Sequence, residues 1–246
     1  MTEDSLKLNI AHLYPNLLNL YGDFGNLLAL QRRCEDRNIQ CEITSINIGD
    51  NIDFDYFDIF FLGGGQDKQQ LIVLNQLLTY KDKLHNAANN GKVFFSVCGG
   101  YQMLGKYFVN KNNEKFDCVG LLDIYTQDKK QRFTGNVTAE VDFLEPKTLV
   151  GFENHSGLTF LENDTKPISK IVVGNGNNGV DKTEGARKNN VFGTYMHGSI
   201  LPKNPHFADY LIKTALDVKY NKNINLVSLD DSLEMLAHND LVNKKY

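Results

Sequence analysis

The first half of the chain alternates between short apolar runs and segments with helical spacing. The extended, apolar runs are residues 7–14, 39–48, 58–62 and 92–97. Helical periodicity is found at residues 26–37, from an N-cap at Asp67 to about Asn90-Gly91, and at residues 99–108. Strands that alternate with helices predict a mainly parallel sheet covered by helices on both faces.

The pattern changes near residue 119. Short strands at residues 136–143 and 171–174, separated by turn-rich loops, predict a mixed extension of the sheet. Residues 191–196 again resemble a buried strand, and residues 205–220 predict an amphipathic helix. Ser228 and Asp231 form a capping-box start for a last helix. We expect one α/β domain over residues 6–216, followed by a helical tail, residues 217–246, that packs on this domain or contacts a partner.

Composition and charge limit the classes of protein to which the chain can belong. The chain has 246 residues, 41% of them hydrophobic and 23% charged, which is ordinary for a globular protein. A net charge of −4 argues against nucleic acid as the main partner. The polar start at Met1–Asp4 and the lack of any apolar window of about 20 residues favour a cytoplasmic protein. The spacing of the four cysteines predicts neither a metal site nor disulfides.

Cys98 is the strongest candidate for chemistry. A buried strand, Lys92–Val97, leads into Cys98, two glycines follow, and helical spacing resumes. This strand–turn–helix order presents a nucleophile at the carboxyl edge of a parallel sheet. The amides at the start of the helix favour the thiolate, which is the reactive form of cysteine. The alternative is a plain core cysteine, and the glycines directly after it argue against that interpretation.

A thiolate nucleophile needs a histidine partner and donors for the developing oxyanion. Of six histidines, His197 follows the apolar strand 191–196 and precedes Gly198, so we expect it at the same sheet edge as Cys98. A histidine at a strand end is otherwise most often a surface or capping residue. The turn Gly63–Gly65 and Gly99 can supply backbone N–H donors, although the former, taken by itself, is better explained as an ordinary glycine-rich turn.

Three motifs together carry a resemblance to a known family. They are Leu62-Gly63-Gly64-Gly65, Cys98-Gly99-Gly100-Tyr101-Gln102 and Tyr195-Met196-His197-Gly198, in that order. They resemble the cobyric-acid-synthase (CobB/CobQ-like) type of class I glutamine amidotransferases. Residues 20–26, 151–155, 175–178 and 198–204 extend the resemblance, which spans about residues 6–216. It implies a flavodoxin-like fold.

The resemblance also implies a glutaminase reaction and its residues. Cys98 would attack the side-chain amide of L-glutamine, and His197 would protonate the departing ammonia. Gly64 and Gly99 match the oxyanion-hole positions, and Gln102 matches a residue that contacts substrate. Arg132 matches a residue implicated in binding glutamine, in keeping with the fit of a guanidinium to a carboxylate.

The family further implies a partner. Ammonia would pass to a Mur-ligase-like subunit (MurT in that family), forming a heterodimer that amidates the D-glutamate α-carboxyl of lipid II for peptidoglycan synthesis at the inner membrane face. We expect no cofactor on this chain, with ATP and Mg on the partner. No P-loop lysine occurs, and the G-x-G-x-x-G run at residues 174–179 opens no helix, as a dinucleotide site would require.

Near His197 the chain departs from the pattern of many class I enzymes. Many class I enzymes carry a glutamate two residues after the histidine, where this chain has Ser199. The cobyric-acid type shares the departure, and the resemblance implies a carboxylate from the partner. Asp23 and Glu153 are alternatives within the chain.

Two other functions are alternatives to a glutaminase subunit. The first is a partner-independent thiol hydrolase or peptidase on the same fold, against which Gln102 argues. The second is a binding module without activity, which the presence of both Cys98 and His197 makes a poor explanation.

Overall fold

The computed structural model describes residues 6–19 and 22–244. The polar start at Met1–Asp4 lies outside the described residues, as do Leu20 and Tyr21 of the 20–26 motif.

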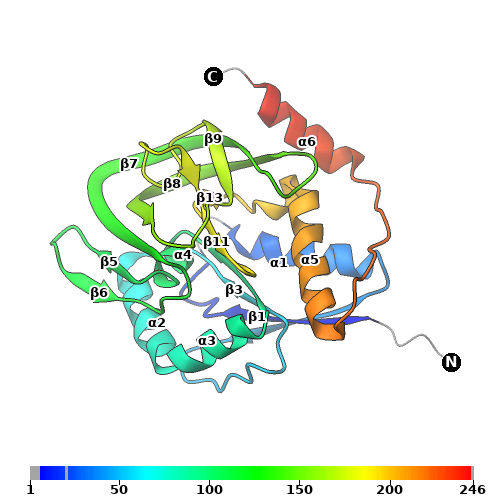
Figure 1. Cartoon of the computed structure of the whole chain (residues 1–246), viewed down its shortest axis with the longest axis horizontal. Coiled ribbons are helices and arrows are strands. Elements are labelled where there is room, and N and C mark those ends of the chain that lie inside the picture. The colour runs from blue at the N-terminus through cyan, green and yellow to red at the C-terminus, as the bar shows by residue number, and fades with distance from the viewer. Residues whose placement is uncertain (1–5, 20–21, 245–246) are drawn as a thin grey trace.

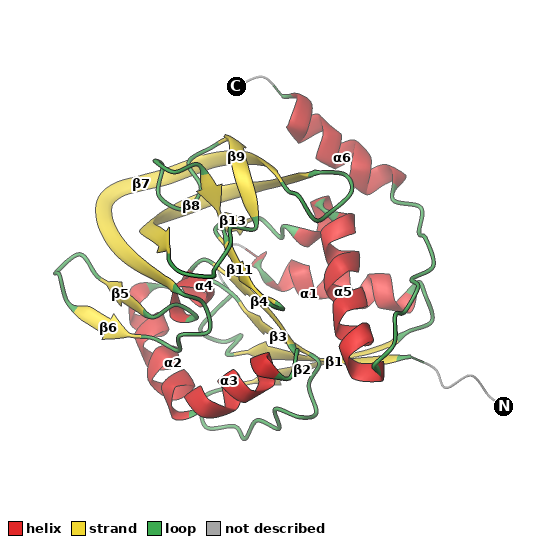
Figure 2. Cartoon of the chain, viewed as in Figure 1, coloured by secondary structure: helices red, strands yellow, loops and turns green. Residues whose placement is uncertain are grey.

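A six-stranded sheet forms the centre of the molecule (Figures 1 and 2). Its strands are β1 (Lys7–Leu13), β2 (Gln40–Ile46), β3 (Ile59–Leu62), β4 (Val93–Val97), β11 (Ala186–Lys188) and β12 (Val191–Thr194). They lie in the order β11-β12-β4-β3-β1-β2, and only the pairing of β11 with β12 is antiparallel. The predicted parallel sheet is therefore confirmed, with one antiparallel edge strand.

Helices cover both faces of this sheet. Helices α1 (Phe24–Glu35) and α5 (Pro205–Tyr220) lie on one face, and α2 (Asp67–Thr79) and α3 (Lys81–Asn89) lie on the other (Figure 1). The residues of β4 alternate between the two sides, as the period of two requires. Phe95 packs edge-on against Phe207 of α5, whereas Phe94 stacks on Phe60 in the other layer. Burial on both faces explains why β3 and β4 are almost wholly apolar.

The remaining strands form a second sheet and do not extend the first. They are β5 (Tyr107–Val109), β6 (Lys115–Asp117), β7 (Ile124–Glu140), β8 (Thr148–Leu161), β9 (Ser169–Val173), β10 (Thr183–Glu184) and β13 (Met196–His197). The expected short strand at 136–143 is the end of β7, which pairs with β8 as a long, curved hairpin (Figure 1). Turn-type residues such as Asp128 lie within this hairpin, where the register shifts between Asp128 and Phe133.

Several expected helix boundaries are wrong. The helix expected at 99–108 is only α4 (Gly99–Met103), because Tyr107 already pairs with β7. Gln66 is the N-cap of α2 and Asp67 its first residue. The long helix expected after Asp67 is instead two helices, α2 and α3. They are separated at Tyr80, whose backbone conformation is not helical. The last helix, α6 (Ser232–Asn243), begins after Asp231, and Ser228 lies in the preceding loop.

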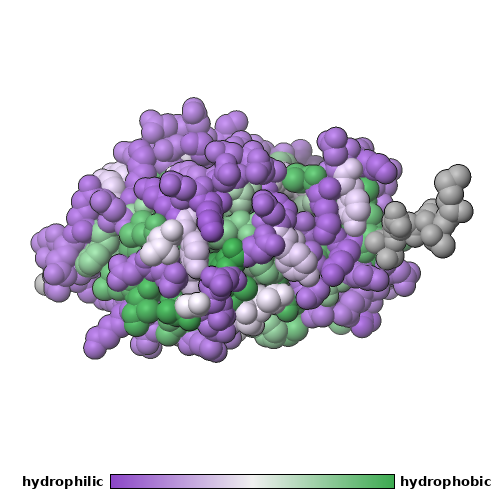
Figure 3. All heavy atoms as spheres, turned by 90° about the horizontal axis from the view of Figure 1, so that it is seen from below, coloured by the Kyte–Doolittle hydropathy of each residue, from purple (hydrophilic) through white to green (hydrophobic). Residues whose placement is uncertain are grey.

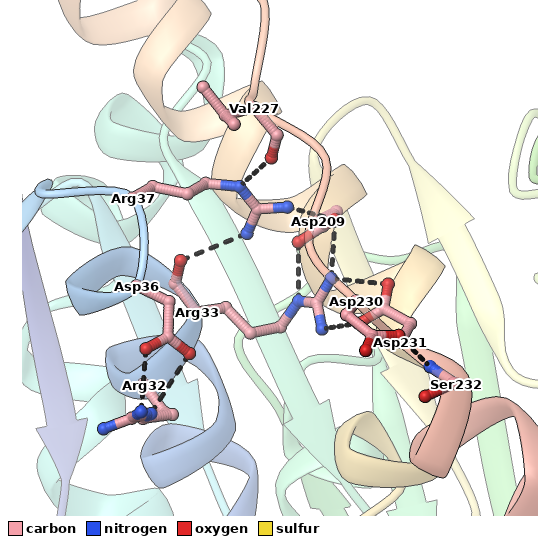
Figure 4. A network of polar contacts seen from close by, with 9 residues as sticks. All are labelled: Arg32, Arg33, Asp36, Arg37, Asp209, Val227, Asp230, Asp231 and Ser232. Atoms are coloured by element: carbon pink, nitrogen blue, oxygen red, sulfur yellow. Dashed lines mark hydrogen bonds and ion pairs between the residues drawn. The ribbon is translucent and has the colours of Figure 1, made fainter.

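The C-terminal segment is tied to the body by charges (Figure 4). Arg33 of α1 contacts Asp209 of α5 and Asp231 before α6, each at 2.6 Å. Arg37 donates to Asp209 and to the carbonyl of Val227. Helix α5 covers Pro205–Tyr220, as the sequence predicted.

The surface is mixed in character. In the view from below, hydrophilic residues dominate and hydrophobic ones form patches between them (Figure 3). Within residues 6–19 and 22–244, none of the helices has the length and apolar character needed to cross a membrane.

Candidate active site

Cys98 stands at a sharp turn between β4 and α4. Its backbone has φ 52° and ψ −108°, a left-handed conformation that a non-glycine residue adopts only when its surroundings enforce it. Its N–H donates to the carbonyl of Thr194 at 2.9 Å, and its side chain is partly exposed. The chain thus holds the thiol at the carboxyl edge of the central sheet, as the sequence predicted.

His197 arrives at this edge by a different route from the one expected. Strand β12 is the parallel neighbour of β4, with Thr194 opposite Val97, and it ends there, not at residue 196. The next residues enter the second sheet, where His197 pairs with Phe152 of β8. The buried carboxylate of Glu184 accepts the Thr194 hydroxyl and the Tyr195 N–H at the crossing point. His197 is therefore buried between the two sheets, with 1% of its surface exposed.

Gly64 is the point at which the site residues converge. A β-carbon on Gly64 would lie 3.3 Å from Cβ of Cys98, Cε1 of His197 and Oδ2 of Asp23. Gly100 is equally constrained, since a β-carbon there would lie 2.7 Å from the carbonyl oxygen of Leu62. The glycine turn and the cysteine turn can approach each other only because these positions have no side chain.

The His197 ring is held in its charged form. Burial opposes the charge, but hydrogen bonding with Asp23 and Cys98 outweighs burial and raises the pKa of His197 to about 10. Nδ1 of His197 lies 3.5 Å from Oδ1 of Asp23, which is itself fully buried. At neutral pH the ring is therefore an imidazolium beside Cys98.

The two predicted oxyanion donors differ in their present partners. Gly99 is the first residue of α4, so its N–H has no acceptor within the helix. The N–H of Gly64 donates to Oδ2 of Asp23 at 2.7 Å. Gly64 can serve an oxyanion only after this bond is released, so its role stays a prediction.

Gln70 is a site neighbour that the sequence did not indicate. Its Nε2 donates to the carbonyl of Gly65 at 2.7 Å, and its amide group fills the space beside Gly99. It therefore ties the glycine turn to the cysteine turn. Gln70 is one of several polar residues in a helix, and nothing in its spacing distinguishes it.

The predicted substrate residues lie on two elements around the dyad. Gln102 follows Cys98 by one helical turn, and its Nε2 donates to the hydroxyl of Tyr195 at 3.0 Å. Arg132 is exposed at the irregular part of β7, and its Nε donates to Oδ1 of Asn154 at 2.6 Å. Both substrate-binding roles stay predictions.

Glu153, one of the two in-chain candidates for orienting His197, is engaged elsewhere. Its oxygens accept the N–H groups of Asn175 and Gly176 and the side-chain amide of Asn175. This turn is the G-x-G-x-x-G segment, and its amides hold a carboxylate of the protein itself.

The other cysteines have a different character. Cys34, Cys41 and Cys118 are free thiols. Burial raises the pKa of Cys118 to about 12, which keeps it protonated.

Among residues 6–19 and 22–244, no cluster of three histidine, cysteine or acidic side chains could hold a metal ion. A cavity of about 620 Å³ lies between the ends of β7, β8 and β9, and none of the predicted site residues lines it.

Comparisons with known proteins identify the family of the chain. Residues 9–205 match the model of the CobB/CobQ-like glutamine amidotransferase domain. The chain is 40% identical to the GatD subunit of the glutamine-hydrolysing lipid II isoglutaminyl synthase of Streptococcus pneumoniae, over 92% of this chain and 87% of that one. Its identity to the Staphylococcus aureus subunit of the same name is 41%, over 87% and 86% of the two chains.

Solved structures support the fold. PurLQS from Thermotoga maritima matches 88% of this chain and 100% of that chain, with a TM-score of 0.56 and 16% identity. A glutamine amidotransferase from the same organism matches 95% of this chain and 93% of that chain, with a TM-score of 0.55 and 14% identity. With the domain match covering most of the sequence, the chain belongs to the CobB/CobQ-like glutamine amidotransferases.

Proposed function

We propose that this chain is the glutaminase subunit of a lipid II isoglutaminyl synthase and that Cys98 forms a thioester with glutamine. The observation that carries this proposal is the convergence of Cys98 and His197 on Gly64, at the carboxyl edge of the sheet. The similarity to two GatD subunits over most of their length supports the choice of complex.

In the first half-reaction, the Cys98 thiolate attacks the side-chain amide carbon of glutamine. A carbon–sulfur bond forms, and the amide oxygen becomes an oxyanion that the N–H of Gly99 can stabilise. The carbon–nitrogen bond then breaks, and the His197 imidazolium donates its proton to the departing nitrogen. The products are ammonia and a glutamyl thioester.

In the second half-reaction, water hydrolyses the thioester. His197, now neutral, accepts a proton from the attacking water, and the carbon–sulfur bond breaks to release glutamate and the Cys98 thiolate. The burial of His197 suits this cycle, because a ring held between two sheets keeps one orientation through both proton transfers.

Substrate recognition is assigned to the wall formed by β7 and by α4. The exposed guanidinium of Arg132 can bind the α-carboxylate of glutamine through two parallel hydrogen bonds. Gln102 adds an amide one helical turn from Cys98. Selection for a free amino acid follows, because a substituent on the α-carboxylate would abolish the ionic contact.

The ammonia is proposed to pass to a MurT-like ligase subunit in a heterodimer. This partner would bind ATP and Mg and amidate the D-glutamate α-carboxyl of lipid II at the inner face of the membrane. Passage through protein keeps ammonia unprotonated and therefore nucleophilic. The tail, residues 217–246, is then either part of the domain or a contact with the partner.

The test compares two nitrogen sources in the purified complex. Cys98→Ala should abolish amidation of lipid II with glutamine and leave amidation with ammonium salts unchanged, because only the glutaminase step needs the thiol. If both activities are lost while the complex stays assembled, Cys98 is structural and the proposal is wrong.

A further inference from the structure

Tyr195 lies between β12 and β13, two residues before His197, and is fully buried. Its ring is packed on two sides. The imidazole of His155, on β8, stacks on its face with the ring centroids 3.7 Å apart and the planes 4° apart. Tyr101 of α4 meets the same ring edge-on, at 5.1 Å. Because both contacts are tight, the ring keeps one orientation and its hydroxyl points in one direction.

The hydroxyl of Tyr195 is part of a chain of side-chain hydrogen bonds in the second sheet. It lies 2.6 Å from Oγ1 of Thr159 on β8, and that oxygen lies 2.7 Å from Oγ1 of Thr126 on β7. Both threonines are buried. Burial raises the pKa of Tyr195 well above its ordinary value, so the hydroxyl keeps its proton. With that proton donated to Thr159, the phenolic oxygen is left as an acceptor.

The phenolic oxygen accepts the side-chain amide of Gln102. Nε2 of Gln102 donates to it at 3.0 Å. The space around this amide is filled, since a β-carbon on Gly157 would collide with Nε2 and lie 2.9 Å from the Tyr195 hydroxyl. Within residues 6–19 and 22–244, Tyr195 is the only partner of the Gln102 amide. The carbonyl oxygen Oε1 is therefore available to a ligand, one helical turn from Cys98.

We infer that Tyr195 is the positioning residue for Gln102 and that it fixes which end of the Gln102 amide faces the substrate. The inference rests on the proposed role of Gln102 in contacting glutamine. Tyr195 precedes His197 by two residues, so the segment that carries the histidine also holds the substrate-binding amide of α4. The two parts of the site thereby keep a fixed spacing although they belong to different elements.

The experiment is a double-mutant cycle in the purified complex. Tyr195→Phe keeps the ring and its stacking but removes the acceptor, so the Gln102 amide is free to turn. Glutaminase kcat/KM should fall by about 3- to 10-fold, through a higher KM, as expected for the loss of one hydrogen bond. Gln102→Ala should lower it by at least as much. In the Gln102→Ala background, Tyr195→Phe should cause no further loss, because the group that it positions is gone.

The reactivity of Cys98 separates positioning of Gln102 from damage to the dyad. Methyl methanethiosulfonate reacts with a thiolate and has neither an amide nor a carboxylate for Gln102 to contact. Its rate of reaction with Cys98, followed by peptide mass spectrometry, should be the same in Tyr195→Phe and in the wild type. A slower rate in Tyr195→Phe would place the effect on the dyad and overturn the inference.

The matched control is Tyr101→Phe. Tyr101 is also a fully buried tyrosine and lies on the same helix as Gln102, but its hydroxyl donates to Oδ1 of Asn177 at 3.1 Å. This variant loses a buried hydroxyl group without touching the Gln102 amide. It should keep the wild-type KM for glutamine, and an equal rise of KM in both variants would overturn the inference.

Unchanged kinetics in Tyr195→Phe overturn the inference, and so does a loss that multiplies with that of Gln102→Ala. If Tyr195→Phe does not fold, Thr159→Val is used in the same cycle. It frees the Tyr195 proton to donate to Oε1 of Gln102 and so reverses the amide, and the same two results overturn the inference. A failure of the proposed function is distinct, because it would appear as glutamine-dependent synthesis that persists in Cys98→Ala.

Discussion

Cys98 and His197 approach each other across a residue without a side chain. Cβ of Cys98 and Cε1 of His197 both lie 3.3 Å from the point at which a β-carbon on Gly64 would stand. The two residues come from different sheets, and the glycine turn after β3 lies between them. The dyad therefore depends on the close packing of three separate segments.

Gly64→Ala should reduce glutaminase activity while the protein stays folded. The added methyl group would press on the thiol, the imidazole and Asp23 together, and displacements of this kind cost about 10- to 100-fold in rate. The control is Gly135→Ala in β7, where a β-carbon would meet nothing within 4 Å. Equal kinetics for the two variants would show that Gly64 does not lie in the site.

Arg132→Ala should weaken the use of glutamine. Loss of a charge-assisted contact with a carboxylate costs about 1.5–3 kcal/mol, so kcat/KM should fall by about 10- to 150-fold, mostly through KM. The neighbouring Gln131→Ala, also exposed on β7, should behave like the wild type. If steady-state kinetics show no difference between these variants, Arg132 does not bind substrate.

Glu184 makes the stability of the protein depend on pH. Burial raises its pKa to about 7 from an ordinary 4.5, so the folded chain holds a proton that the unfolded chain has released. Stability contributed by this group therefore falls between pH 4.5 and 7, and the full cost of about 3 kcal/mol is present above pH 7.

In Glu184→Gln this cost is absent, because the side chain is neutral at every pH. The stability of the variant relative to the wild type should rise from pH 4.5 to 7 and then level off, as measured by urea unfolding. The variant Gln131→Ala, which changes an exposed side chain that does not titrate, should give a difference that does not vary with pH. A flat difference for Glu184→Gln would mean that the carboxylate is ionised at no cost.

The ion pairs of Arg33 should hold the C-terminal segment against the rest of the protein. The Arg33 side chain is 8% exposed and contacts both Asp209 and Asp231 (Figure 4). Arg33→Ala removes a positive charge that neutralises two partly buried carboxylates. Removing one partner of a buried ion pair lowers the free energy of unfolding by about 3–5 kcal/mol. We expect a lower Tm and faster proteolysis between residues 221 and 231. The adjacent Arg32→Ala, whose side chain is 73% exposed, should change neither.

The central sheet could be predicted from the sequence because burial on both faces leaves an unambiguous pattern. The apolar runs at β3 and β4 and the glycines after them are visible without any structure. The long β7–β8 hairpin could not be recognised, since its strands mix polar and apolar residues and contain an irregular register. Its pairing is set by contacts between distant segments, which local spacing does not reveal.

The site was predictable to a similar extent. Cys98 is marked by its local turn, and His197 by the apolar strand before it. Asp23 is brought beside His197 by packing between segments far apart in the chain, and no spacing rule connects those positions. Gln70 reached the site only through the packing of α2 beside α4.

The most direct test of the account is covalent labelling with a diazo-ketone analogue of glutamine, followed by peptide mass spectrometry. The account predicts one adduct, on Cys98, that excess glutamine prevents and that His197→Ala slows. Labelling of Cys34, Cys41 or Cys118 in place of Cys98, or labelling that glutamine does not prevent, would contradict it.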